Sequence, residues 1–123
     1  MPAFDFTDKT IIDKLAKGLE KFPHVAILTD EVYDRLIFDK KEIPTFFNYP
    51  NLYDRLIVLN GWSKTYAMTG WRLGWGVWPE NLVEYVFKFC VNNHSCVNTA
   101  AQYGAIAALE GPEDHLNDMM KEF

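Results

Sequence analysis

Three apolar runs divide the chain and predict the strands of a sheet. They span Val25 to Leu28, Leu56 to Leu59 and Leu73 to Trp78. Short apolar runs of this kind are typical of buried strands in a sheet that is covered on both faces. We therefore predict an α/β fold, in which ligands bind at the carboxyl ends of parallel strands.

Apolar residues with helical spacing surround these runs and predict the helices. The helices are expected at residues 11–19, 80–91, 98–110 and 113–123. Either Thr7 or Thr10 could cap the first helix, and Asn98 is suited to cap the third, because hydroxyl and amide oxygens accept from free helix N–H groups. Residues 33–38 are expected to extend the first strand, and residues 39–51, which contain two prolines, are expected to form a surface loop.

The polar loop after the second run carries a candidate site. Arg72 lies eight residues after Lys64 and opens the third run, so a tight return at residues 68–70 could bring both toward one cavity. The pair suits a phosphorylated carbonyl compound, because the amine can form an imine while the guanidinium binds the phosphate. If the first two strands are parallel neighbours, Asp30 shares an edge of the sheet with Lys64.

These residues, in this order, resemble the class I and II aminotransferases, which are fold-type I enzymes that use pyridoxal 5'-phosphate. The similar motifs are Asp30-Glu31-Val32-Tyr33, Ser63-Lys64 and Met68 to Trp75, and the resemblance runs from about Phe6 onward. It implies part of a large, cofactor-binding domain. That part would hold about three adjacent strands, the last of them antiparallel, covered by helices.

The resemblance also implies a role for each candidate side chain. Lys64 would form the Schiff base with the cofactor and then move a proton, and Asp30 would pair with the pyridinium nitrogen. Tyr33 would bond the ring oxygen, and Ser63 and Arg72 would bind the phosphate.

One position departs from the family pattern. The family often has a second hydroxyl residue three positions before the lysine, where this chain has Gly61. The phosphate is therefore expected to be bound by fewer groups than in family members that have this hydroxyl.

Length and charge limit the function further. The chain has 123 residues and a net charge of -5 with mixed signs, which argues against nucleic acid as a partner. Members of the family are several times longer, so residues 1–123 are expected to form a single partial domain, without the N-terminal half of the large domain and without the small domain. No apolar run reaches membrane-spanning length, and residues 1–5 lack a signal-peptide pattern, so a soluble, cytoplasmic protein is expected.

The resemblance implies transfer of an amino group between an amino acid and a 2-oxo acid, in a full-length enzyme that is a homodimer. These residues alone are expected to have little activity. Two alternatives stay open: a non-catalytic folded fragment that only packs or associates, and a lyase or synthase on the same scaffold, since a cofactor motif does not fix the reaction.

The remaining candidate residues are assigned packing roles or none. Cys90 and Cys96 lie six positions apart, about 240° around a helix, so they are not expected to bind a metal together. The three histidines are too scattered for a metal site. Tyr66 is expected to pack, and Trp71 either to pack or to line the substrate pocket.

Overall fold

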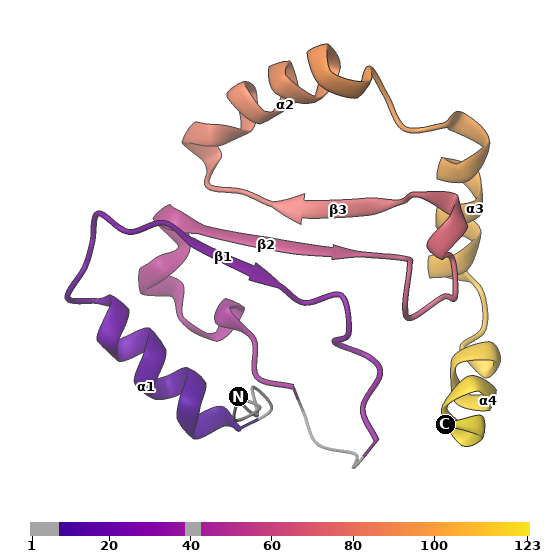
Figure 1. Ribbon diagram of the computed structural model, residues 1–123, viewed down its shortest axis with the longest axis horizontal. Helices are drawn as coiled ribbons and strands as arrows, with labels where there is room; N and C mark the ends of the chain where they lie inside the picture. Colours follow the sequence, from indigo (N-terminus) through magenta and orange to yellow (C-terminus); the bar gives the residue numbers. More distant parts are fainter. Residues whose placement is uncertain (1–7, 39–42) are drawn as a thin grey trace.

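The computed structural model describes residues 8–38 and 43–123, and its centre is a three-stranded sheet (Figure 1). The strands are β1 (Ile27–Asp30), β2 (Leu56–Gly61) and β3 (Gly74–Val77), in the order β1-β2-β3. β1 and β2 are parallel, with Asp30 opposite Leu59, and β2 and β3 are antiparallel, with Gly61 opposite Gly74. The expected α/β fold, with its last strand antiparallel, is confirmed.

The N-terminal cap of helix α1 (Lys9–Leu19) is not one of the two threonines that were expected. The Asp8 carboxylate accepts a hydrogen bond from the Thr10 backbone N–H at 2.8 Å, so Asp8 is the cap and the prediction of Thr10 was wrong. The alternative, Thr7, lies outside the described residues. At the other end, the Arg55 guanidinium donates to the carbonyl oxygens of Leu19, Phe22 and Val25 at 2.8 to 2.9 Å. This side chain ties the helix to the start of β2.

The main core lies between α1 and the sheet. Leu52 and Val58 are fully buried at its centre. The other buried members of this core are Ile12, Ala16, Ile27, Phe46 and Leu56. Phe46 and Leu52 come from two 3₁₀ helices, Phe46–Asn48 and Pro50–Arg55. The expectation of a surface loop at residues 39–51 is therefore wrong for residues 46–48, which form a helical turn with a buried phenylalanine. Residues 39–42 lie outside the described residues.

Three helices follow β3. They are α2 (Glu80–His94), α3 (Thr99–Glu110) and α4 (Asp114–Glu122). The Asn98 side chain accepts from the Ala101 N–H at 3.1 Å, which confirms the predicted cap of α3. A second buried cluster joins α3 to the segment between β2 and β3, through Met68, Leu73, Ala101 and Ala105.

Helix α2 differs from the others because it contains no buried residue. It arches beyond β3, away from the main core (Figure 1). Several of its aromatic side chains are two-thirds exposed, among them Tyr85, Phe87 and Phe89. In the part of the chain that the structure describes, no helix combines the length and the apolar character needed to cross a bilayer.

Candidate functional site

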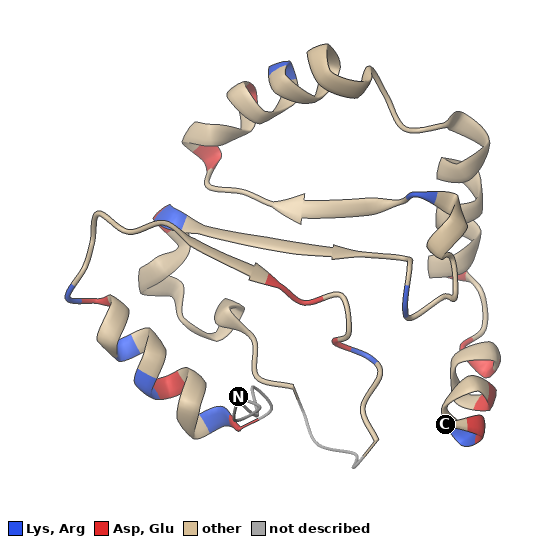
Figure 2. Cartoon of the chain, in the orientation of Figure 1, with Lys and Arg blue, Asp and Glu red and all other residues tan. Residues whose placement is uncertain are grey.

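The candidate residues gather at one edge of the sheet because of how the strands run. β1 ends at Asp30, β2 ends at Gly61, and antiparallel β3 begins beside that end at Gly74. Figure 2 shows acidic positions at the end of β1 and basic positions in the loop after β2 and just before β3. The predicted shared edge for Asp30 and Lys64 is confirmed by the parallel pairing.

The chain turns immediately after Asp30. An Asp30 carboxylate oxygen accepts from the Val32 N–H at 3.1 Å, and the Glu31 N–H donates to the Leu59 carbonyl at 2.8 Å. An aspartate that bonds the backbone two residues ahead favours a turn over a continued strand. The expected strand extension over residues 33–38 is therefore wrong, because these residues form turns and loop.

Lys64 and Tyr33 meet across the two loops. The Lys64 Nζ lies over the Tyr33 ring, 5.3 Å from its centroid. Such a cation–π contact at an exposed site contributes about 0.5–1 kcal/mol, enough to favour one side-chain placement without locking it. The lysine loop itself is a turn, in which the Tyr66 N–H donates to the Trp62 carbonyl and the Ala67 N–H to the Lys64 carbonyl.

Arg72 has an unusual backbone. Its φ of 56° and ψ of 48° place it in the left-handed region, where a residue with a Cβ is strained by roughly 1–2 kcal/mol. Strain of this kind clusters at ligand clamps and switch regions. Its guanidinium donates to the Thr69 carbonyl at 2.8 Å, which orients the side chain over the short 3₁₀ turn Thr69–Trp71.

Ser63 precedes Lys64 and is half-buried. Its neighbour Trp62 is anchored on α3, where the indole N–H donates to the Ala105 carbonyl at 3.2 Å. No hydrogen bond among the described residues joins Ser63 to Arg72, the two predicted phosphate ligands.

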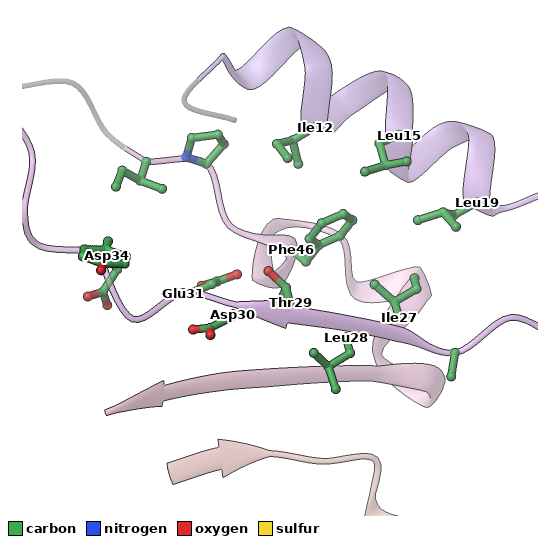
Figure 3. Close-up of a pocket in the computed structure, with 14 residues that line it drawn as sticks. Ile12, Leu15, Leu19, Ile27, Leu28, Thr29, Asp30, Glu31, Asp34 and Phe46 are labelled. Atoms are coloured by element: carbon green, nitrogen blue, oxygen red, sulfur yellow. The ribbon is translucent and has the colours of Figure 1, made fainter. Parts of the chain in front are cut away.

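Two of the cavities among the described residues are lined by candidate residues of the site. One, of about 640 Å³, lies between α1 and β1, and both Asp30 and Tyr33 line it. Its walls are apolar side chains that point from α1 toward the strand, and its mouth carries acidic side chains (Figure 3). The other, of about 710 Å³, holds Arg72 with residues of α3. The structure thus brings Tyr33 and Lys64 together and separates Asp30 from Arg72.

Trp71 borders the cavity of Arg72 and also packs on α3. A Cβ added at Gly104 would lie only 2.5 Å from the Trp71 ring, so the indole lies directly against the helix backbone. The side chain remains half exposed. The expectation that Trp71 packs is confirmed, and the expectation that it lines the substrate pocket stays a prediction.

Several polar contacts around the site were not predicted. The Asn60 side chain donates to Asp34 at 2.9 Å and so joins the end of β2 to the loop after β1. Arg35 forms an ion pair with Glu113 at 2.5 Å. No local pattern signals these partners, because each pair joins segments that are distant in the sequence.

The chain is similar to aminotransferases of known sequence and structure. The chain is 42% identical over 122 residues to a probable aspartate aminotransferase of Methanocaldococcus jannaschii, covering 94% of this chain and 31% of that protein. The crystal structure of an aromatic aminotransferase from Pyrococcus horikoshii matches with a TM-score of 0.86 at 32% identity, over 94% of this chain and 31% of that one.

An aspartate aminotransferase structure from Thermotoga maritima matches with a TM-score of 0.79 at 32% identity, over 92% of this chain and 29% of that one. The chain therefore spans about a third of the length of the relatives it matches. Residues 5–123 match the family model described as aminotransferase class I and II, and the chain belongs to that family.

Proposed function

We propose that this chain forms part of the large domain of an enzyme that transfers an amino group between an amino acid and a 2-oxo acid, with pyridoxal 5'-phosphate as cofactor. One observation carries the proposal. The Lys64 amine lies over the Tyr33 ring, at the edge of the sheet where β1 ends in Asp30 and where Arg72 leads into β3.

The donor set at this edge fits that cofactor. It offers a carboxylate for a pyridinium, a primary amine for a carbonyl, and a guanidinium with a hydroxyl for a phosphate. Among residues 8–38 and 43–123, none of the ion pairs involves Asp30, Lys64 or Arg72. Their charges are therefore available to a ligand.

Each side chain has a definite task in this proposal. When bound, pyridoxal phosphate supplies a carbonyl carbon that reacts with amines and a protonated ring that withdraws electrons. Asp30 would hold the proton on the ring nitrogen, and Tyr33 would donate a hydrogen bond to the ring oxygen. Lys64 would provide the primary amine that holds the cofactor at its carbonyl carbon, with release of water, and the Lys64 Nζ would accept and return a proton.

Phosphate binding falls to Ser63 and Arg72. The Arg72 guanidinium keeps N–H groups beyond the one that donates to Thr69, and a guanidinium binds phosphate oxygens in pairs. Gly61 adds no hydroxyl, and a Cβ there would lie 2.7 Å from the Leu73 carbonyl oxygen. In this chain the close approach of β2 and β3 leaves no room for a Cβ at this position.

The proposal names a reaction class and leaves the amino acid open. Structural neighbours that are both 32% identical to the chain are named for aspartate and for aromatic amino acids. We further propose that the full-length enzyme is a homodimer and that residues 1–123 alone have little activity, because they span about a third of their relatives.

Reductive trapping tests the proposal. The purified chain is mixed with pyridoxal phosphate and reduced with borohydride, and the pyridoxyl adduct is located by peptide mass spectrometry. Lys64 should be labelled ahead of exposed lysines such as Lys14, and Lys64→Ala should remove only that adduct. Equal labelling of surface lysines, unchanged in the variant, would contradict the proposed role of Lys64 in this chain.

A second variant tests the neighbour of Lys64. Tyr33→Phe keeps the ring beneath the amine and removes the hydroxyl, whereas Tyr33→Ala removes both. If the ring contact places Lys64, Tyr33→Ala should lower selective trapping more than Tyr33→Phe does. Equal loss in the two variants would assign the effect to the hydroxyl alone.

A further inference from the structure

The start of helix α4 touches both loops of the candidate site. The Arg35 guanidinium forms an ion pair with Glu113, with Nη2 and Oε1 2.5 Å apart. The Tyr66 ring stacks on the His115 ring, with centroids 5.5 Å apart and planes 24° apart. We call Arg35, Tyr66, Glu113 and His115 the α4 cluster.

The α4 cluster is continuous across the two loops. The pKa of Arg35 is raised above its usual value, chiefly by the hydrogen bond with Glu113 and in smaller part by Tyr66. Arg35 therefore interacts with the acid on α4 and, more weakly, with the phenol on the lysine loop.

The helix that presents these groups is itself anchored. Leu116 is buried, and its N–H donates to the Glu113 carbonyl at 3.0 Å. The His115 ring nitrogen Nδ1 lies 3.3 Å from the Pro112 carbonyl oxygen. Glu113 and His115 thus lie at the start of a helix whose Leu116 side chain is buried.

The other two members of the α4 cluster lie close in the sequence to the candidate site residues. Arg35 follows Tyr33 by two residues, and Tyr66 follows Lys64 by two residues. The cluster therefore fixes both loops next to the two side chains that meet at 5.3 Å. Reactive groups must be held closely, because a misplacement of about 1 Å can lower a rate roughly a hundredfold.

We propose that Glu113 and His115 are positioning residues that hold the Tyr33–Lys64 pair in place from outside the site. As a statement about catalysis, this rests on the proposed function of Lys64. The contacts are partly exposed, so they add little to global stability. Their effect is local, on the two loops.

Hydrogen exchange provides a test that needs no cofactor. The variant Glu113→Ala/His115→Ala removes both contacts from α4. Asp118→Asn is the matched control, since Asp118 pairs with Lys121 at 2.8 Å on the same helix and, among the described residues, forms no hydrogen bond or ion pair with either loop. In the double variant, amides of residues 31–38 and 62–68 should exchange about two to five times faster, as expected for loss of a weak exposed contact. The control should leave these rates unchanged, and β2 should be unaffected in both.

A second readout addresses the chemistry of Lys64. Competitive acetylation gives the rate of Lys64 relative to exposed Lys14, and this ratio should change in the double variant and stay constant in Asp118→Asn. The charge swap Arg35→Glu/Glu113→Arg restores an ion pair and should return the ratio toward that of the unmodified chain. A merely structural role for Glu113 would not require that rescue.

The outcomes separate this inference from the proposed function. The inference would be overturned if the amides of the two loops exchanged at the same rate in the double variant as in Asp118→Asn. This holds whatever the trapping experiment gives. Failure of selective trapping at Lys64, together with faster loop exchange in the double variant, would overturn the proposed function and leave the positioning of the two loops supported.

Discussion

Substituting Gly61 by alanine should separate strands β2 and β3 where the site begins. Gly61 lies opposite Gly74, and a Cβ at Gly61 would lie 2.7 Å from the Leu73 carbonyl oxygen and 3.1 Å from the Gly74 Cα. Ordinary contacts start near 3.4 Å. Both obstructing atoms belong to the backbone, so no side-chain rotation can relieve the overlap. The strands themselves must move.

The size of the effect follows from this overlap. Forcing an added methyl group into a packed site costs about 1–3 kcal/mol. With a urea dependence of roughly 2 kcal/mol per molar, a loss of about 2 kcal/mol lowers the unfolding midpoint by about 1 M urea. Selective trapping of pyridoxal phosphate at Lys64 should fall in the same variant, because the lysine loop follows directly after Gly61.

Gly70 provides the matched control for Gly61. It lies in the same connection between β2 and β3, but a Cβ there meets no atom within 4 Å and its φ is not positive. Gly70→Ala should therefore be neutral or stabilising by about 0.4–1 kcal/mol. Tryptophan fluorescence in urea suits both variants, because all four tryptophans lie between residues 62 and 78. Equal midpoints for Gly61→Ala and Gly70→Ala would refute the steric argument.

Four further results are expected. Leu52→Ala should lose about 2–5 kcal/mol in urea unfolding, because Leu52 is fully buried, and a loss below about 1 kcal/mol would contradict its place in the core. Asn60→Ala should lose about 1 kcal/mol with its hydrogen bond to Asp34, and a double-mutant cycle with Asp34→Ala should show coupling. The Tyr49 hydroxyl donates to Asp13, which raises the pKa of Tyr49 to about 12. The stabilising effect of that bond is present below pH 10 and is lost as the pH rises through 12, and Asp13→Asn should lower the pKa seen in tyrosine absorbance titration. Finally, the outer edges of β1 and β3 have no partner strand in the described sheet, so the isolated chain should associate, whereas a monodisperse monomer in light scattering at high concentration would contradict this.

The strands were predictable because their apolar runs are continuous and short. The order of the sheet came from the family resemblance, and the structure confirms it. The 3₁₀ helices Phe46–Asn48 and Pro50–Arg55 were not predicted because they are too short to show a helical period. Pro44 and Pro50 in the same stretch also favoured a loop. The cap of α1 was misassigned because Asp8 and Thr10 are both capable caps, and only the extended backbone of Asp8 decides between them.

The site was predictable as far as strand ends could place it. Asp30 and Lys64 follow apolar runs, so their common edge followed once the two strands were taken as parallel. The turn after Asp30 was missed because its side chain bonds the Val32 N–H, a choice that a strand pattern does not reveal. The contacts of Glu113 and His115 depend on where α4 packs, which no pattern near Lys64 records.

Because α2 is exposed, its free energy of unfolding should differ from that of the sheet. A helix of 15 residues without buried side chains depends almost entirely on its own backbone bonds, and isolated helices of that length are marginal in water. The sheet and α1 instead share a packed core. Circular dichroism, which includes α2, and tryptophan fluorescence, which reports on residues 62 to 78, should therefore trace different unfolding curves. The circular dichroism signal should begin to fall before the fluorescence signal, because α2 is lost before the sheet unfolds.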